Sequence, residues 1–389
     1  MYKWTCPEVL SLLGIQYKLN RPENVIPCPF CGGKRFAMNI QKGIGHCFNC
    51  SATADSAAYY AQSTGQTLHE GRKDIESRLN IKDDTPRPDR IVYSNETTEE
   101  DLASETNLNL AYSAFLSELM LSNENRDNLL ARGFNMSTID MLGYKTFPRK
   151  NEIDYIALCK RLQQNQVSLK GIPGFYKAKY GDYSFVQLTK GIIMPIRNIH
   201  NEIIGLQIRK DDDKRVYQPD EGKLEAKCSW FSSKGFPHGT SAHGWVHYAT
   251  DFRFDGNKTK KWWAVVGDTV ILTEGAMKAD LIHLLSGVPT IAVPGVNNIV
   301  HLSKELTLLR KLGVKKILHC YDMDYKTNPN VANAMKKTKT LIEESGLEYQ
   351  FCEWETKVNV AGEYKEVLKG LDDYLAYIYK GIVPKVQKN

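Results

Sequence analysis

The chain has 389 residues, of which 42% are hydrophobic and 25% are charged, and its formal net charge is +6. This length exceeds one ordinary hydrophobic core and predicts two or three compact units. The composition is typical of globular proteins and contains no apolar run long enough to cross a membrane, so we expect neither a disordered chain nor a membrane-spanning one.

The N-terminal stretch, residues 1–13, has one lysine and an interrupted apolar pattern. It lacks the charged start and the long apolar stretch of a secretory signal, so the expected location is the cytoplasm. Short helices are predicted over 7–13 and 55–62, on either side of a cysteine-rich segment. We expect residues 1–65 to form the first domain.

The cysteine-rich segment contains the pairs Cys28-Pro-Phe-Cys31 and Cys47-Phe-Asn-Cys50, with fifteen residues between them. Two such turns supply four thiolates for a tetrahedral structural zinc ion, and the intervening residues are long enough for a small hairpin. The chain has nine cysteines in all, an odd number that argues against a disulfide framework. The other five are expected to be small buried residues.

Basic and aromatic residues alternate around the predicted zinc site, as recognition of a single strand of DNA requires. These residues are Lys34, Arg35, Phe36, Lys42, His46 and Phe48. We interpret the segment as a zinc ribbon that reads DNA, although a purely structural zinc would explain the cysteines as well. His46 is expected to be a neighbour of the site and not a ligand, because four cysteines are already in register.

Residues 66–105 are polar and proline-punctuated, and they hold 6 Lys+Arg against 11 Asp+Glu, a net charge of −5. Such a composition buries little apolar surface, so we predict a flexible acidic linker. The flanking parts carry +3 (residues 1–65) and +8 (residues 106–389). The two flanking parts are therefore both basic, which is what we expect if each presents a surface that binds the phosphates of a nucleic acid.

From residue 106 the pattern becomes globular again. Helical spacing runs through 108–121 and 129–142. Alternating apolar residues then predict a hairpin of strands 192–197 and 203–208 that turns at 198–201. We expect residues 106–267 to form a mixed α/β basic subdomain.

Beyond residue 268, strands and helices alternate. Strands are predicted at 269–273, 289–293, 315–321 and 349–354, and helices at 276–285 and 299–312. This alternation predicts a parallel sheet that is covered on both faces, within a last domain at 268–389.

Three carboxylates follow strands of this predicted sheet. Glu274 ends the first strand and is followed by Gly275 and a helix, and Asp322 and Asp324 follow a later strand. The carboxyl ends of parallel strands share one edge, so the three acids are expected to meet there. Their hard oxygen atoms suit magnesium or manganese, the ions that catalyse phosphoryl transfer.

Three further groups of charged residues bear on this site. Lys278, one turn into the helix after Glu274, is either a phosphate contact or an exposed helix lysine. Asp372 and Asp373 either contribute an outer or second-metal ligand or cap a helix. The acidic run 211–213 is expected to be a solvated loop.

Over nearly its whole length the chain resembles the DnaG-type primases of bacteria and phages. The segment 25–65 is similar to the family's zinc-binding domain in the four-cysteine form of phage primases, and 129–144 and 191–209 are similar to the start of its polymerase domain and to its basic subdomain. The acids Glu274, Asp322 and Asp324 match the Toprim signature. The resemblance therefore implies a multidomain α+β and α/β fold: a zinc ribbon, a basic subdomain and a Toprim-type parallel-sheet domain.

The same resemblance implies a DNA-directed RNA polymerase that makes short RNA primers from ribonucleoside triphosphates on single-stranded DNA. In that family the basic subdomain lines a groove for template and nucleotides, which makes Arg197, Arg209 and Lys227 candidates for phosphate contacts. No P-loop occurs in the sequence. A separate helicase partner and a phage, plasmid or other mobile element in a bacterial host are therefore expected. A Toprim nuclease and a non-catalytic single-strand-binding accessory protein stay open as alternatives.

Overall fold

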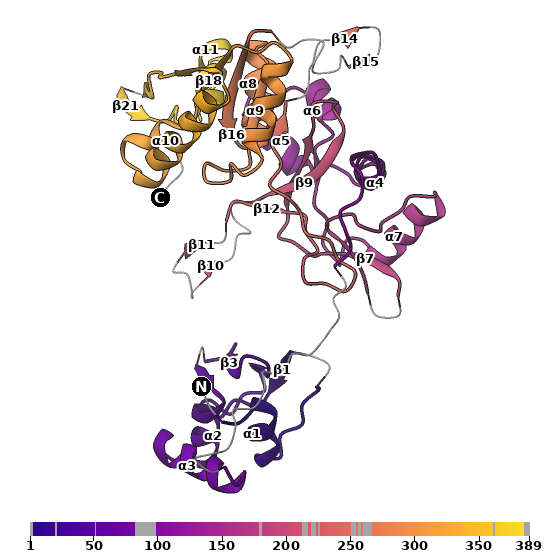
Figure 1. Cartoon of the computed structure of the whole chain (residues 1–389), viewed down its shortest axis with the longest axis vertical. Coiled ribbons are helices and arrows are strands. Elements are labelled where there is room, and N and C mark those ends of the chain that lie inside the picture. The colour runs from indigo at the N-terminus through magenta and orange to yellow at the C-terminus, as the bar shows by residue number, and fades with distance from the viewer. Residues whose placement is uncertain are drawn as a thin grey trace. The chain divides into compact units, whose positions relative to one another are not determined.

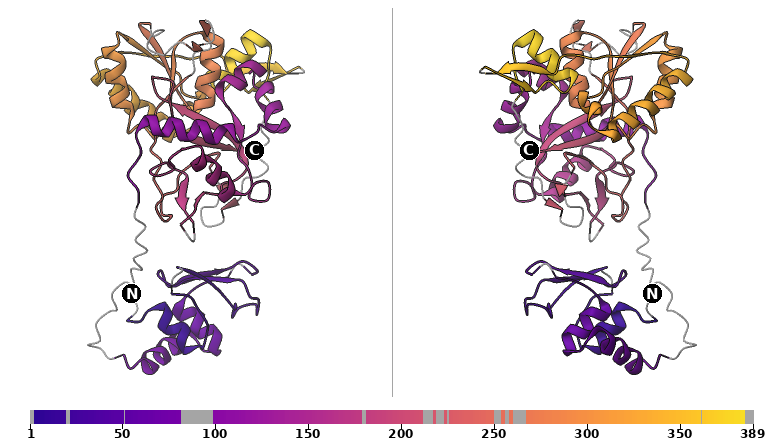
Figure 2. Two further views of the ribbon diagram at one scale, coloured as in Figure 1. Left: turned by 90° about the vertical axis from the view of Figure 1, so that its right-hand side faces the viewer. Right: turned by 90° about the vertical axis from the view of Figure 1, so that its left-hand side faces the viewer.

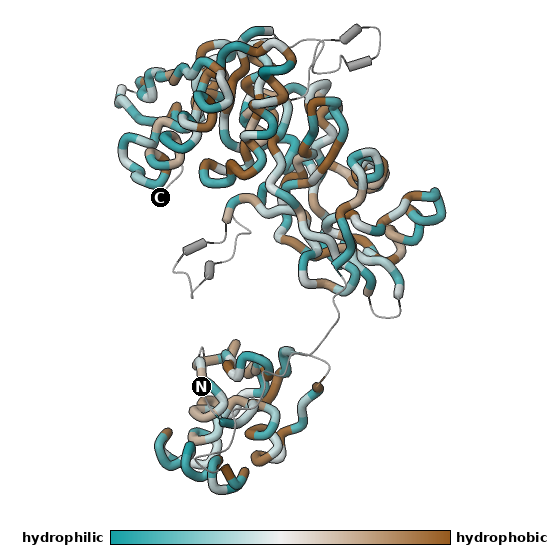
Figure 3. Tube along the Cα trace, viewed as in Figure 1, coloured by the Kyte–Doolittle hydropathy of each residue, from teal (hydrophilic) through white to brown (hydrophobic). Residues whose placement is uncertain are grey.

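The computed structural model describes residues 3–19, 22–50, 52–81, 99–178, 181–211, 217–218, 223–224, 226–249, 254–255, 258–259, 267–360 and 362–384. The chain forms two compact units, 1–96 and 97–389, and Figure 1 labels helices and strands of each. Each unit has its own hydrophobic core, and the hydropathy of the chain varies within both (Figure 3). Among the described helices, none has the length and apolarity needed to span a membrane.

The first unit is built on a small antiparallel sheet in the order β1-β2-β3-β4. Phe36 and Met38 of the second strand and Tyr59 of a following helix form its core. The unit has few large buried residues, so a metal centre is expected to supply part of its stability. Its first elements are β1 (Glu23–Ile26), β2 (Phe36–Asn39), β3 (Ile44–Cys47), β4 (Thr53–Asp55), α1 (Cys6–Leu12) and α2 (Ser56–Thr64).

The structure corrects the start of the predicted linker. Helix α3 (Leu68–Arg78) begins with a capping box between Thr67 and Glu70, and its Ile75 is fully buried. Gly71 lies so close to Ala61 of α2 that a β-carbon would be 2.8 Å from the Ala61 side chain. The polar composition was misleading because a surface helix needs only a narrow apolar stripe to pack. Residues 82–98 of the predicted linker lie outside the described residues.

The second unit opens with helices. The predicted helical run 129–142 is interrupted, because Gly133 adopts a φ of 109° and Asn135 caps a new helix. The helices of this part are α4 (Glu105–Ser117), α5 (Asn123–Ala131), α6 (Met136–Leu142) and α7 (Tyr155–Gln164).

A four-stranded antiparallel sheet follows, in the order β12-β9-β8-β5. The predicted hairpin is confirmed, since β8 (Gly191–Arg197) pairs antiparallel with β9 (Ile203–Lys210). A cluster of phenylalanines packs against this layer, including Phe115 and Phe231, whose rings are stacked. The remaining strands here are β5 (Lys145–Thr146), β6 (Phe175–Lys177), β7 (Tyr183–Phe185), β10 (Tyr217–Gln218), β11 (Lys223–Leu224), β12 (Cys228–Trp230), β14 (Phe254–Asp255) and β15 (Lys258–Thr259).

The expected parallel sheet is present and has the order β13-β17-β16-β18-β19. The edge strand β13 is antiparallel to its neighbour, and the other pairs are parallel. The strands are β13 (His247–Tyr248), β16 (Thr269–Glu274), β17 (Thr290–Val293), β18 (Lys316–His319) and β19 (Glu348–Phe351). A small hairpin of β20 (Lys357–Val360) and β21 (Glu363–Glu366) comes after them.

Helices cover both faces of this sheet, and Figure 2 shows them on either side of the strands. Val270 and Leu272 of β16 pack with residues of α9 (Leu302–Lys311) and α10 (Pro329–Glu344). The intervening Ile271 packs on the opposite face with residues of α8 (Ala276–Ser286) and α11 (Leu371–Lys380). Because alternate side chains face opposite sides of a strand, both faces are apolar, and only the strand ends are left for polar chemistry.

A buried polar network joins the two sheets of the second unit. Asp280 of α8 accepts a hydrogen bond from the Tyr144 hydroxyl at 2.7 Å and lies 3.1 Å from His247 Nε2. The backbone N–H of Arg197 points at His247 Nδ1 at 3.1 Å, so Nδ1 accepts and Nε2 carries the proton that is donated to Asp280. The network fixes the position of α8, the helix that follows Glu274.

We expect Asp280→Ala to lower the free energy of unfolding of this unit by about 3 kcal/mol, because Tyr144 and His247 would then be buried without their acceptor. Tyr144→Phe is the matched variant, and it should cost only about 1 kcal/mol because it removes one hydrogen bond. Urea unfolding followed by circular dichroism measures both values. Equal losses in the two variants would contradict a central role for Asp280.

Candidate active site and zinc centre

The four predicted cysteines of the zinc site converge in the first unit. The sulfur atoms of Cys28, Cys31, Cys47 and Cys50 all lie within 4.8 Å of one another, and the Cys28–Cys50 and Cys31–Cys47 pairs are both 3.8 Å apart. Bonds of about 2.3 Å to a tetrahedral zinc ion place sulfur atoms roughly 3.8 Å apart, so the cluster has the dimensions of a zinc site. A structural zinc therefore fits these residues.

Only some of the residues that were predicted to contact DNA lie on the surface of this unit. Lys34, Arg35 and Phe48 are exposed, with 64% of Phe48 accessible. Phe36 was predicted to join them, and this is wrong, because its ring is fully buried in the core. His46 contacts Thr53 Oγ1 at 3.2 Å and lies outside the cysteine cluster.

In the second unit, the acids at the strand ends meet. Glu274 ends β16, and its Oε1 lies 3.4 Å from the backbone nitrogen of Asp322, which follows β18. Asp324 lies in the short 3₁₀ helix Met323–Lys326 that comes next. The parallel register of β16 and β18 produces this meeting, since both strands end at the same edge.

Lys278 lies between these carboxylates and is not an exposed helix lysine. Its Nζ atom is 2.9 Å from Glu274 Oε1 and forms a second ion pair with Asp322 Oδ1. Burial opposes its charge, but Glu274 and Asp322 outweigh burial and raise the pKa of Lys278. A permanent positive charge therefore lies at the centre of the acid cluster.

Helix α11 adds two more acids to the cluster. A β-carbon at Gly370 would lie 2.2 Å from Asp372 Oδ1 and 3.1 Å from Asp322 Oδ1, so a glycine is needed where the two carboxylates come together. Asp372 is only 4% exposed. Asp373 Oδ2 accepts a hydrogen bond from the Gly370 N–H at 3.4 Å, which makes it a capping residue of α11.

The crowded acids resist ionisation. Burial raises the pKa of Glu274 to about 8, against the opposing effect of Lys278. Burial, followed by the charge of Asp372, raises the pKa of Asp373 to about 7, and burial and Asp322 raise the pKa of Asp324. Asp322 differs, because Lys278 lowers its pKa in spite of burial. More negative charge is gathered here than one lysine can balance.

Among the described residues, three buried carboxylate oxygens of the cluster have no hydrogen-bond partner: Glu274 Oε2, Asp324 Oδ1 and Asp372 Oδ1. A buried carboxylate oxygen without a partner is costly unless a cation meets it. The donors are all hard oxygen atoms, and magnesium and manganese prefer such ligands. The residues present therefore fit a divalent metal ion.

Lys278→Met should strengthen the binding of Mn²⁺ to the metal-free protein by about tenfold or more. The ammonium group occupies the Glu274 and Asp322 oxygens that a metal ion needs, and it repels a second cation at short range. Titration of Mn²⁺ followed by electron paramagnetic resonance measures this affinity without any reaction. Lys339→Met, which removes a half-exposed lysine on α10, is the control, and an equal change in both variants would contradict the competition.

The three basic residues of the second unit that were predicted to contact phosphate differ in their exposure and in their contacts. Arg197 directs its guanidinium at the backbone carbonyls of Asn201 and Leu142, at 3.1 and 3.2 Å, so its described contacts favour a structural role. Lys227 is exposed and Arg209 is half-buried, near the pairing of β12 with β9. Of the acidic run 211–213, only Asp211 lies within the described residues.

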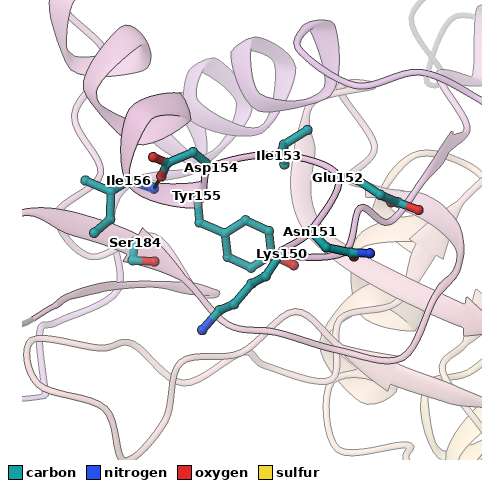
Figure 4. Close-up of a pocket in the computed structure, with 8 residues that line it drawn as sticks. All are labelled: Lys150, Asn151, Glu152, Ile153, Asp154, Tyr155, Ile156 and Ser184. Atoms are coloured by element: carbon teal, nitrogen blue, oxygen red, sulfur yellow. Dashed lines mark hydrogen bonds between the residues drawn. The ribbon is translucent and has the colours of Figure 1, made fainter.

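A separate pocket lies at the N-terminal end of α7 (Figure 4). It is lined by Lys150, Asn151, Glu152, Ile153, Asp154, Tyr155, Ile156 and Ser184. None of the predicted site residues lines it. Asp154 already caps the helix, accepting from the backbone of Ile156 and Ala157, so the pocket offers no cluster of catalytic groups.

Sequence reasoning missed two features of the acid cluster: the bridging position of Lys278 and the approach of Asp372 to Asp322. The bridging position of Lys278 had a usable signal, since a lysine in the first turn of the helix after Glu274 has a stem long enough to reach back to the end of the strand. The approach of Asp372 had no local signal, because it depends on the packing of α11 against α8.

The structure combines a four-cysteine cluster that fits zinc with a parallel sheet whose edge carries a cluster of acids. The chain is similar in sequence to known DNA primases. The chain is 27% identical to a DNA primase of Thermotoga maritima over 76% of its own length and 47% of the relative. It is 25% identical to a DNA primase of Helicobacter pylori over 82% of its own length and 52% of the relative. The predicted resemblance to DnaG-type primases is confirmed.

The chain spans about half the length of the curated relatives it matches. Residues 262–379 match a family model described as "Domain of unknown function (DUF3854)". Among solved structures, the zinc-binding and RNA polymerase domains of the Aquifex aeolicus primase cover 89% of this chain and 77% of that chain, with 16% identity and a TM-score of 0.46.

Proposed function

We propose that this protein is a DNA primase that synthesises short RNA primers on single-stranded DNA by metal-dependent nucleotidyl transfer. The observation that carries the proposal is the convergence of Glu274, Asp322, Asp324 and Asp372 at one edge of a parallel sheet, with buried carboxylate oxygens that lack partners. The sequence similarity to DNA primases supports the same activity.

In this proposal the acids have different roles, which follow from where each of them lies. Glu274 and Asp322, which share Lys278, would hold a magnesium or manganese ion together with Asp324. Asp372 is placed to complete the site or to hold a second ion, and Asp373 caps its helix. Such an ion, when bound, would stabilise the attacking and departing oxygens of the transferred phosphate.

Lys278 has a role of its own in the proposed reaction. In the structure it balances two carboxylates, and its ammonium group would move away from them if they held a divalent cation. The released group can then contact a phosphate of the incoming ribonucleoside triphosphate, because a lysine has a flexible stem and three donors.

The zinc ribbon is proposed to contact the DNA template through Lys34, Arg35 and Phe48, and Arg209 and Lys227 to contact phosphates of template or nucleotide. Exposed basic and aromatic side chains suit the backbone and the bases of a single strand, respectively. We place the protein in the cytoplasm of a bacterial host, acting with a separate replicative helicase in the replication of a phage, plasmid or other mobile element.

The deciding experiment incubates the protein with an unprimed single-stranded DNA template, labelled ribonucleoside triphosphates and Mg²⁺ or Mn²⁺. Short RNA products are expected. Shortening of the template would indicate a Toprim nuclease instead, and binding without either reaction would indicate a non-catalytic accessory protein.

A further inference from the structure

A row of aromatic rings comes from segments that meet near the edge of the parallel sheet at which β16 ends. Trp230 and Trp245 have ring centroids 5.6 Å apart, and His243 lies 5.3 Å from Trp245 at an interplanar angle of 20°. His301 lies 6.0 Å from His243 with the two planes only 1° apart. These four residues, the aromatic row, come from three segments that are distant in the sequence.

The sheet topology places this row on the edge that carries the acids. His243 and Trp245 come just before β13, which runs antiparallel to β17, and His301 follows the loop after β17. The start of β13 and the end of β17 therefore share the edge at which β16 ends in Glu274. Neighbouring strands lie roughly 5 Å apart, which puts β13 about 10 Å from β16.

The local backbone is shaped to hold these rings. A β-carbon at Gly205 of β9 would lie 2.8 Å from the Trp245 ring and 3.2 Å from the Trp230 ring, and one at Gly244 would lie 2.4 Å from Asn298. Glycine at both positions lets the indoles lie against β9 and lets the loop after β17 approach His243. The row is thus a packed feature and not a chance meeting of mobile side chains.

The rings differ in exposure and orientation. His243 is exposed, whereas Trp230, Trp245 and His301 are half-buried, and both indoles pack against the hydrophobic core of the unit. His243 is nearly parallel to Trp245 and His301, whereas Trp230 meets Trp245 edge to face at 68°, so the exposed His243 is the ring that a base can reach first. Uncovered aromatic faces bind nucleobases in a sequence-tolerant way, because every base has a π-face.

We propose that the aromatic row is a stacking platform for unpaired bases of a single nucleic-acid strand whose backbone passes the acid cluster. Four rings extend over more than the size of one base. We therefore expect the ligand to be a strand of several nucleotides and not a single nucleotide. This inference rests on the proposed function, since it assigns the base-contacting part of the same site.

The test compares a labelled single strand of DNA with a strand of equal length that carries abasic sites, using fluorescence anisotropy and the full chain without metal or nucleotide. His243→Ala and Trp245→Leu should each weaken binding of the normal strand by about fivefold or more and leave binding of the abasic strand unchanged. Tyr379→Ser, which removes an exposed ring on α11, is the control and should change neither. Circular dichroism verifies that each variant is folded, and His243→Ala keeps the test valid if Trp245→Leu is not, because His243 is exposed.

Two results would overturn the platform: unchanged binding of the normal strand in both variants, or equal losses on the normal and the abasic strand. The assay is independent of catalysis. Base-dependent losses in a protein that makes no primers would support the platform and refute the polymerase, whereas primer synthesis with intact binding in both variants would refute the platform alone.

Discussion

Replacing Asp322 and Asp324 together by asparagine should reduce primer synthesis by about a thousandfold or more. The substitution keeps the size of both side chains but removes the negative charge that a divalent ion needs, and metal stabilisation of the transferred phosphate contributes several kcal/mol to such reactions. The measurement is incorporation of labelled ribonucleotides on an unprimed single-stranded template.

This loss should occur in a folded protein. Burial and Asp322 raise the pKa of Asp324, so removing the charge of Asp324 relieves crowding, whereas the change at Asp322 also removes an ion pair with Lys278. Thermal unfolding of the second unit, measured beside the activity, verifies that the double variant is folded. Asp182→Asn, at an exposed ion pair with Lys160, is the matched control and should retain activity. Undiminished synthesis by the double variant would remove the proposed active site.

Removal of the zinc ion should unfold the first unit and leave the second intact. Apparent binding free energies of structural zinc are on the order of 10 kcal/mol, which exceeds the stability that a small core provides. We expect Cys28→Ser with Cys47→Ser to abolish zinc binding and to make residues 1–81 sensitive to protease. Elemental analysis and limited proteolysis measure the two effects.

Cys228→Ser provides the control for this experiment. Cys228 lies on β12 of the second unit and is half-buried, so its loss should change neither the zinc content nor the protease pattern of the first unit. A first unit that stays folded and protease-resistant without zinc would show that its core, built around Phe36 and Tyr59, is sufficient.

Much of the site could be predicted from local patterns. The cysteine spacing identified the four sulfur atoms that meet in the structure, because two short turns bring each pair together whatever surrounds them. Likewise the position of Glu274 and Asp322 at the ends of strands predicted their meeting, because parallel strands end at a common edge. The first geometry follows from residues that are close in the sequence, and the second follows from the regular arrangement of strands in a parallel sheet.

Packing between distant segments decided the rest. Helix α3 was not predicted because its residues are mostly polar. Its contact with α2 is what buries Ile75 and makes it a core residue. The bridge from Lys278 to two acids, the burial of Asp372 beside Asp322 and the structural contacts of Arg197 all depend on how helices lie against the sheet. A sequence states which side chains carry charge, whereas their neighbours, and therefore their pKa values and partners, exist only once tertiary packing has removed water from between them.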